Sequence, residues 1–137
     1  MLILNRPENR NSMNLECFSS LREIFPRFDE DPDVWVVIIK AEGKCFTGGL
    51  DLYEAANVFS ADFADSREHL RKTISEVQES INMIERCRKP VIEAAHGLCI
   101  GAGVDLLSAC DIRMACKDAI FSIRETKIAI IADLGTL

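Results

Sequence analysis

The chain has 137 residues, 48% of them apolar and 28% charged, with a formal net charge of −6 and a sequence pI of about 4.9. This composition is typical of a folded globular chain and unlike that of a disordered one. The acidic balance argues against binding to nucleic acid or to an anionic membrane, because both require a basic patch. The sequence has no apolar run of about 18 residues that could span a membrane and no signal-peptide pattern at its N-terminus, so neither is expected.

The first elements along the chain are predicted to be a strand, a helix and a second strand. The opening segment MLILNR predicts a short strand. Asn14 is suited to cap a helix, because apolar residues then recur at steps of three and four. Pro26 is expected to end or bend that helix. The continuous β-branched run VWVVIIK at 34–40 predicts a buried strand.

The rest of the chain continues this alternation of strands and helices. In chain order we expect a glycine-rich loop at 41–52, a long amphipathic helix at 61–87, a buried strand at 91–95, a turn at 96–101, a short helix at 102–109 and two short strands at 111–116 and 119–123. This order is typical of the α/β class. The last segment, RETKIAIIADLGTL, is apolar and no helix follows to cover it. We therefore expect one core domain, 1–137, that is incomplete at its C-terminus.

Two of these strands, 34–40 and 91–95, are each followed by a glycine-containing loop and then by a helix. Glycine permits a positive φ and a close backbone approach, and the first N–H groups of a helix are unpaired. Two such turns side by side would direct N–H groups at one point and form a site for an anion or oxyanion. A tight turn explains either loop on its own. A dinucleotide fingerprint is excluded, because Leu106 stands where its third glycine is required.

The cysteines and histidines do not predict a metal site. The six cysteines are scattered without a CxxC pair, and His69 and His96 lie far from any paired spacing. The cysteines are expected to be free thiols in a reducing compartment. We interpret His96 as a packing residue with a satisfied ring, in preference to a catalytic group.

Three stretches resemble the enoyl-CoA hydratase/isomerase, or crotonase, superfamily. CFTGGLDL at 45–52 resembles its F-[ST]-[AG]-G-x-D-L loop. KPVIEAAHGLCIGAGVDLLSACDIRMA at 89–115 resembles its second signature, K-P-x-I-A-A-x-x-G-x-x-x-G-G-G-x-[ED]-L-x-x-x-C-D-x-R. NRPENRNSMN at 5–14 is similar to its opening N-R-P…R-N-x-x-N. The match runs in register along nearly the full chain, whereas the family's proteins are about twice as long.

This resemblance implies a crotonase-like spiral of ββα units, truncated before the C-terminal helical region, that acts on an acyl-CoA thioester. The backbone N–H groups of Leu50 and Ala102 would hold the thioester oxygen. The family usually has glycine where Ala102 stands, so its methyl group is expected to crowd that oxygen. The implied substrate-binding residues around these two amides are Gly48, Gly49, Asp51, Gly101 and Gly103. We expect Asp51 and Asp111 also to hold the ends of a loop and a strand.

The acids of the chain indicate which reaction the oxyanion site serves. The set Asp105, Glu125 and Asp133 resembles that of the Δ3,5-Δ2,4-dienoyl-CoA isomerases of the superfamily. By this resemblance Asp133 is the base at C2, Glu125 the acid at C6, and Asp105 an auxiliary charge that tunes Glu125. Taken singly, Asp105 could favour a helix's first turn, Asp133 could cap a following helix, and Glu125 could be a solvated surface acid.

Two other functions compete with isomerisation. The first is hydration of an enoyl-CoA, against which the short Asp105 argues, because a longer glutamate reaches the water better. The second is a truncated, inactive homologue that binds CoA weakly or modifies the assembly of full-length partners.

The resemblance also implies properties of the intact protein. Coenzyme A belongs to the substrate, so neither a separate cofactor nor a metal is expected. A full-length chain would form a homo-oligomer, a trimer or hexamer, in mitochondria or peroxisomes. The 137-residue chain alone is expected to be poorly stable and to have little activity.

Overall fold

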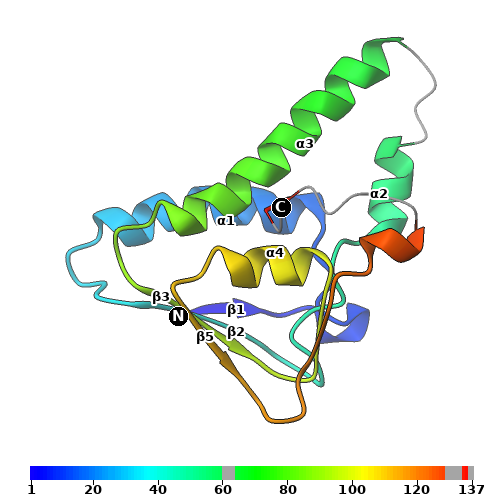
Figure 1. Cartoon of the computed structure of the whole chain (residues 1–137). Helices are drawn as coiled ribbons and strands as arrows, with labels where there is room; N and C mark the ends of the chain where they lie inside the picture. Colours follow the sequence, from blue (N-terminus) through cyan, green and yellow to red (C-terminus); the bar gives the residue numbers. More distant parts are fainter. Residues whose placement is uncertain (60–63, 129–133, 136–137) are drawn as a thin grey trace.

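The computed structural model describes residues 1–59, 64–128 and 134–135, and it places helices over one face of a parallel sheet (Figure 1). The sheet contains β1 (Leu2–Leu4), β2 (Val37–Ala41), β3 (Val91–Ala95) and β5 (Ile112–Ala115), in the order β1-β2-β3-β5. All three pairings are parallel, so each strand reaches its neighbour through a crossover connection. The predicted α/β class is confirmed.

Helices α1 (Leu15–Glu30) and α4 (Ala102–Ser108) lie over this sheet with the C-terminal half of α3 (Ala64–Glu85), whose other half extends away from it (Figure 1). The core lies between these helices and the sheet. Its largest fully buried apolar side chains are Met13, Phe18, Phe25, Val37, Ile39, Phe46, Ile84, Val91 and Leu106. No described helix combines the length and apolarity that a membrane crossing requires.

The Asn14 cap of α1 was predicted correctly, but of the two effects expected of Pro26, a helix end or a bend, the helix end is wrong. The Asn14 side chain accepts a hydrogen bond from the Cys17 amide at 3.0 Å, as an N-cap residue does. Pro26 does not end the helix, which continues to Glu30. Phe25 is buried and its ring meets that of Phe28 edge-on, with centroids 5.9 Å apart. This packing offsets the hydrogen bond that proline cannot make.

Strand β2 begins three residues later than predicted and is buried on one face only. Val37 is the first residue to pair with β3, opposite Val91, while Trp35 before it is 82% exposed. A continuous β-branched run predicts burial on both faces. In the described part of the chain, however, no helix covers the face that carries Ile38 (Figure 1).

A second sheet replaces the turn predicted at 96–101. Strand β4 (Leu98–Ile100) pairs in parallel with β6 (Ile120–Ser122), and the positive-φ residues Gly97 (+58°) and Gly101 (+54°) lie at its two ends. The partner of β4 lies far along the sequence, which a three-residue pattern cannot reveal. Beyond these sheets, the structure contains α2 (Leu52–Phe59) and two short 3₁₀ helices, η1 (Pro7–Asn9) and η2 (Glu125–Ile128). Helix α2 was not predicted.

Candidate active site

The first glycine loop is held in place by Thr47 and Asn11, both buried. The Thr47 hydroxyl donates to the Asn11 carbonyl at 2.6 Å and accepts from the Gly49 amide at 3.1 Å. The Asn11 side chain donates to the carbonyls of Glu42 and Cys45 at 2.8 and 2.9 Å. Gly49 has φ +91°, a conformation that favours glycine. The loop is therefore rigidly positioned up to the Leu50 amide.

The second glycine turn joins β4 to α4. Gly101 has φ +54°, and its amide donates to the Ser122 carbonyl of β6 at 2.9 Å. Ala102 is the first residue of α4, where a helix leaves its N–H groups without intrahelical acceptors. Its own side chain is 1% exposed and belongs to the hydrophobic core. The methyl group is thus packed against protein on most sides.

The two turns meet, as predicted from their matching layouts. A Cβ at Gly49 would lie 2.7 Å from the Ile100 carbonyl oxygen and 3.6 Å from the Ala102 nitrogen. The first loop also bonds to β4, since the Thr47 amide donates to the Leu98 carbonyl at 3.0 Å. Neither the Leu50 amide nor the Ala102 amide donates a hydrogen bond to any described residue. Two rigid loops therefore present two available N–H donors, which is the requirement for an oxyanion site.

Two of the three predicted acids lie beside these amides. Asp105 on α4 is 1% exposed and lines the same cavity as Leu50 and Ala102. Glu125 begins η2, and a Cβ at Gly101 would lie 2.7 Å from its Oε1 atom. Its Oε2 atom is buried and accepts no hydrogen bond within the described ranges. Asp133 lies outside the described residues.

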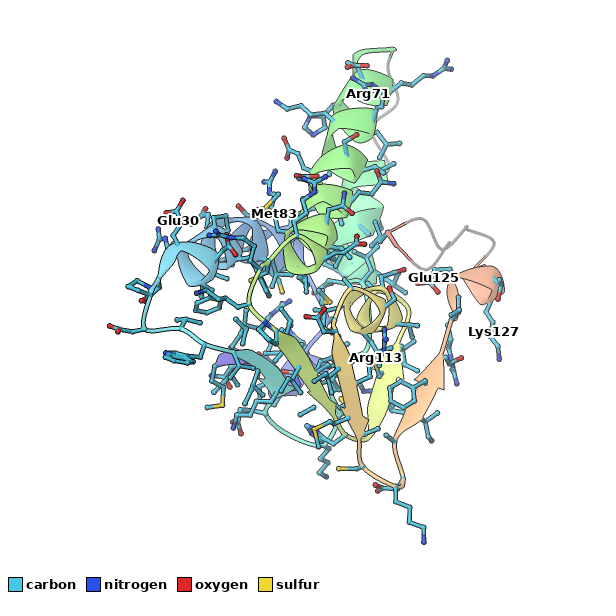
Figure 2. The ribbon with its side chains drawn as sticks, turned by 60° about the vertical axis from the view of Figure 1, so that its left-hand side comes forward. Glu30, Arg71, Met83, Arg113, Glu125 and Lys127 are labelled. Carbon is cyan, nitrogen blue, oxygen red and sulfur yellow. The ribbon has the colours of Figure 1, made fainter. Side chains whose placement is uncertain are left out.

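The cavity that these groups share has a volume of about 400 Å³. Apolar side chains from the first glycine loop and from β4 form part of its wall, including Leu50, Leu98 and Ile100. Three cationic side chains also line it: Arg10, Arg124 and Lys127. Figure 2 shows Glu125 and Lys127 on η2, beside β6. Although the chain is acidic overall, three cationic side chains lie around this cavity, and their charge suits an anionic ligand.

The predicted substrate-binding residues Gly103, Gly48 and Asp51 have different structural roles. Gly103 is required for packing, because a Cβ there would lie 2.2 Å from Thr47 Cγ2. Gly48 has room for one, since its nearest contact would be an ordinary 3.6 Å from Arg10. Asp51 accepts from the Ser12 hydroxyl at 3.1 Å and from the Glu54 amide, and so holds the start of α2. Burial works to raise the pKa of Asp51, but these hydrogen bonds and Arg6 hold it below its usual range.

Asp111 and His96 make the structural contacts predicted for them. Asp111 Oδ2 accepts from the Val91 amide at 2.8 Å and ties the ends of two strands together. The His96 ring pairs with the Gly43 carbonyl at 2.9 Å. All six cysteines are free, and burial raises the pKa of Cys99 and Cys110 to about 12.

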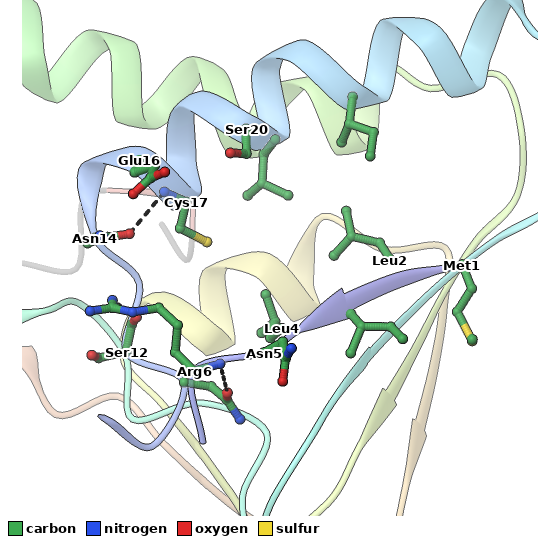
Figure 3. Close-up of a pocket in the computed structure, with 14 residues that line it drawn as sticks. Met1, Leu2, Leu4, Asn5, Arg6, Ser12, Asn14, Glu16, Cys17 and Ser20 are labelled. Carbon is green, nitrogen blue, oxygen red and sulfur yellow. Dashed lines mark hydrogen bonds between the residues drawn. The ribbon is translucent and has the colours of Figure 1, made fainter. Parts of the chain in front are cut away.

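Sequence reasoning missed Glu93, a buried acid in β3. It alternates with Val91 and Ala95, so its place on the inward face of the strand could have been read from period two. It also missed a cavity of about 480 Å³ between β1 and α1, lined by Leu2, Leu4 and Cys17 among others (Figure 3). The described residues contain no group of three or more potential metal ligands.

Comparison with known proteins identifies the family. The model of the enoyl-CoA hydratase/isomerase family matches residues 1–137, and the chain belongs to this family. The chain is similar to an enoyl-CoA hydratase structure from Bacillus anthracis, with a TM-score of 0.84 and 33% sequence identity. The superposition covers 97% of this chain and 49% of the hydratase chain. The predicted crotonase-like fold is thus confirmed.

Two curated relatives show a more specific likeness. The peroxisomal Delta(3,5)-Delta(2,4)-dienoyl-CoA isomerase of Arabidopsis thaliana is 46% identical over 141 residues, covering 99% of this chain and 51% of the relative. The mitochondrial Delta(3,5)-Delta(2,4)-dienoyl-CoA isomerase of Homo sapiens is 45% identical over 138 residues, covering 98% and 42%. The chain therefore spans about half the length of these relatives.

Proposed function

We propose that this chain carries the oxyanion site and the acids of a Δ3,5-Δ2,4-dienoyl-CoA isomerase. The proposal rests on one observation above all: the available Leu50 and Ala102 amides share a cavity with Asp105 and Glu125. The two isomerases at 46% and 45% identity support the choice of reaction. The cations around the cavity suit the phosphates of coenzyme A, which belongs to the substrate, so no separate cofactor is proposed.

The oxyanion site would stabilise the intermediate. Removing a proton at C2 of a 3,5-dienoyl-CoA makes an extended enolate, conjugated with both double bonds, whose negative charge gathers on the thioester oxygen. The Leu50 and Ala102 amides would donate to that oxygen, and loss of one such donor typically costs about 10²–10³ in rate. Both donors belong to the backbone of rigid turns, so little reorganisation is needed as the charge develops.

Two carboxyl groups of opposite protonation would move the protons. Asp133 takes the proton from C2, and Glu125 returns one to C6. Asp105, buried in α4, orients or tunes Glu125. The position of Glu125 against Gly101 supports its part in this scheme. The role of Asp133 rests on the resemblance alone.

Hydration of a 2-enoyl-CoA is the competing function, since the Bacillus anthracis structure at 33% identity is an enoyl-CoA hydratase. Hydration needs two groups that grip one water, and aspartate at 105 is shorter than the glutamate suited to that task. A non-catalytic CoA-binding homologue is the third candidate, because the chain spans about half of its relatives.

Ultraviolet absorbance with a 3,5-dienoyl-CoA distinguishes the three functions. It should be recorded for this chain and for a version extended to the length of the relatives. Growth of the conjugated 2,4-dienoyl chromophore in either protein supports the isomerase. Hydration of 2-enoyl-CoA without that growth would transfer the assignment to hydratase. Binding of CoA without either reaction would favour the non-catalytic homologue.

Replacement of the proposed acid tests the mechanism. In whichever of the two chains is active, Glu125→Gln should lower kcat by about 10²–10⁴, the usual contribution of a general acid. Glu85→Gln, on the exposed surface of α3, is the matched control and should leave kcat unchanged. Equal rates in the two variants would remove Glu125 from the mechanism.

We further propose that the full-length protein is a homo-oligomer, trimeric or hexameric, in mitochondria or peroxisomes. The printed locations of the two isomerases support the compartments. Fractionation of cells and light scattering of the extended chain test these two points separately.

A further inference from the structure

Glu93 is a buried carboxylic acid in β3, and no step of the proposed reaction uses it. It lies in the middle of β3 with 0% of its surface exposed, between Ile39 of β2 and Arg113 of β5. The Cys99 thiol approaches its Oε1 atom at 4.0 Å, a weak contact. Within the described ranges, its Oε2 atom has no hydrogen-bond partner. An ionised carboxylate in such a place is costly.

Burial accordingly raises the pKa of Glu93 to about 8, against a smaller lowering by the Arg113 charge. The titratable and charged groups on the elements around it are Cys99 of β4, Asp105 of α4, Cys110 and Asp111 after α4, and Arg113 of β5. Strand β2 contributes the apolar Ile39. Near neutral pH Glu93 therefore keeps its proton in the folded chain.

The groups next to Glu93 are also those that hold α4. A Cβ at Gly103, in the first turn of α4, would lie 3.2 Å from Cys99 Sγ. At the other end of the helix, Arg113 Nη1 donates to the Ser108 carbonyl at 3.3 Å, and Figure 2 shows Arg113 close to α4. The Cys99 thiol, and Arg113 of the neighbouring strand, thus link the surroundings of Glu93 to the two ends of the helix.

The thiol of Cys110 completes this set. Its Sγ atom donates to the Leu106 carbonyl of α4 at 3.3 Å. Burial raises the pKa of Cys110, and the Glu93 charge raises it further. Cys99 thus lies beside the start of α4, while Cys110 and Arg113 donate hydrogen bonds to its middle and its end.

We propose that Glu93 is a positioning residue for the oxyanion turn: the protonated acid supports α4 from below, and its ionisation displaces the Ala102 amide. When the proton leaves to solvent, Arg113, opposite Glu93 on the neighbouring strand β5, pairs with the new negative charge. Pairing takes the guanidinium from the Ser108 carbonyl and releases the C-terminal end of α4. The helix has only seven residues, so movement at one end reaches Ala102 at the other.

Carbon-detected NMR of the ¹³C,¹⁵N-labelled 137-residue chain between pH 5.5 and 9.5 tests this proposal. The Glu93 Cδ shift should titrate with a midpoint near pH 8, and the Ala102 and Gly103 shifts should follow the same midpoint. Glu93→Gln, a neutral variant of the same shape, should abolish the transition at 102–103. Glu85→Gln on the exposed surface of α3 should leave it in place.

A second variant keeps the test decisive if Glu93→Gln folds poorly. Arg113→Gln removes the cation that lowers the Glu93 pKa, so the midpoint at Glu93 and Ala102 should move together to higher pH. Ala102 shifts that ignore the Glu93 midpoint, or that titrate unchanged in Glu93→Gln, would overturn the proposal. The proposal rests on the proposed role of the Ala102 amide, but this readout is conformational, so failure of the isomerase assignment leaves it interpretable.

Discussion

Glycines at the site satisfy two different physical requirements. Gly49 and Gly101 have positive φ values of +91° and +54°, so their backbone conformation disfavours any side chain. Gly103 has an ordinary helical conformation but no space, because Thr47 Cγ2 occupies the position of a Cβ. The contact between Gly103 and Thr47 therefore fixes how closely α4 approaches the first loop.

This contact predicts the effect of adding one methyl group. Gly103→Ala should lower the free energy of unfolding by about 1–3 kcal/mol, the usual cost of overpacking a core. Gly48→Ala, where the nearest contact is 3.6 Å, is the matched control and should change stability little. Urea denaturation measures both. Equal stabilities would mean that Thr47 yields without cost.

The raised pKa of Glu93 predicts how the free energy of unfolding depends on pH. Its pKa rises from 4.5 to about 8 on folding, so between these pH values the folded chain holds a proton that the unfolded chain has released. Stability must therefore fall as pH rises through this window, by at most about 1.4 kcal/mol per pH unit. Below pH 4.5 both states are protonated and the contribution is constant.

Urea denaturation at pH 5, 6.5 and 8 isolates this contribution. The difference in unfolding free energy between Glu93→Gln and the unchanged chain should grow in favour of the variant as pH rises. Glu85→Gln should show no such trend. A difference independent of pH would mean that Glu93 ionises in the folded chain as easily as in the unfolded one.

At the scale of an element, α1 depends on its cap. The Asn14 side chain satisfies the Cys17 amide, one of the donors that a helix start leaves unpaired. Asn14→Ala should destabilise the chain by about 1 kcal/mol, whereas Asn14→Ser should retain most of the stability. Thermal unfolding followed by circular dichroism compares the two. A serine variant as unstable as the alanine variant would point to a role other than capping.

Local patterns predicted the elements whose causes are local. The α1 cap, strand β3 and α4 can all be predicted from residue type and spacing. Strand β4 and the end of α1 cannot be predicted in this way, because tertiary contacts determine where they form. Leu98–Ile100 becomes a strand through pairing with β6, and α1 continues past Pro26 because aromatic rings pack on either side of it.

The candidate site was predictable to a similar degree. The glycine loops and the acids at 105 and 125 could be named from their motifs, and the structure brings them to one cavity. The cations at 124 and 127 could not, since only the return of the chain through β6 places them there. Asp133 stays a prediction.

At the scale of the molecule, the face of the four-stranded sheet that no described helix covers predicts self-association. Apolar side chains on it are substantially exposed: Ile3 39%, Ile38 36%, Ile112 48% and Met114 59%. Contiguous apolar patches of this kind promote association. Light scattering should therefore show a mass that rises with concentration.

A paired substitution tests the origin of that association. Ile112→Thr together with Met114→Thr keeps the β-branched preference of β5 while making its outer face polar. This variant should scatter less than the unchanged chain at the same concentration. Tyr53→Thr, which removes an 84% exposed side chain from α2, is the control. If the two variants scatter alike, the sheet face is not the cause.

The parallel pairing of remote segments also governs when the site can form. Thr47 of the first loop forms a bridge with Cys99, and the Gly101 amide donates to the Ser122 carbonyl. The loops that carry the Leu50 and Ala102 amides are therefore held by partners from later parts of the chain. Closing such long loops costs entropy before any contact repays it, which slows folding. During synthesis, the donor pair cannot assemble until residue 122 has left the ribosome. A nascent chain stalled before β6 should therefore keep its long helices yet lack the geometry that selects a ligand.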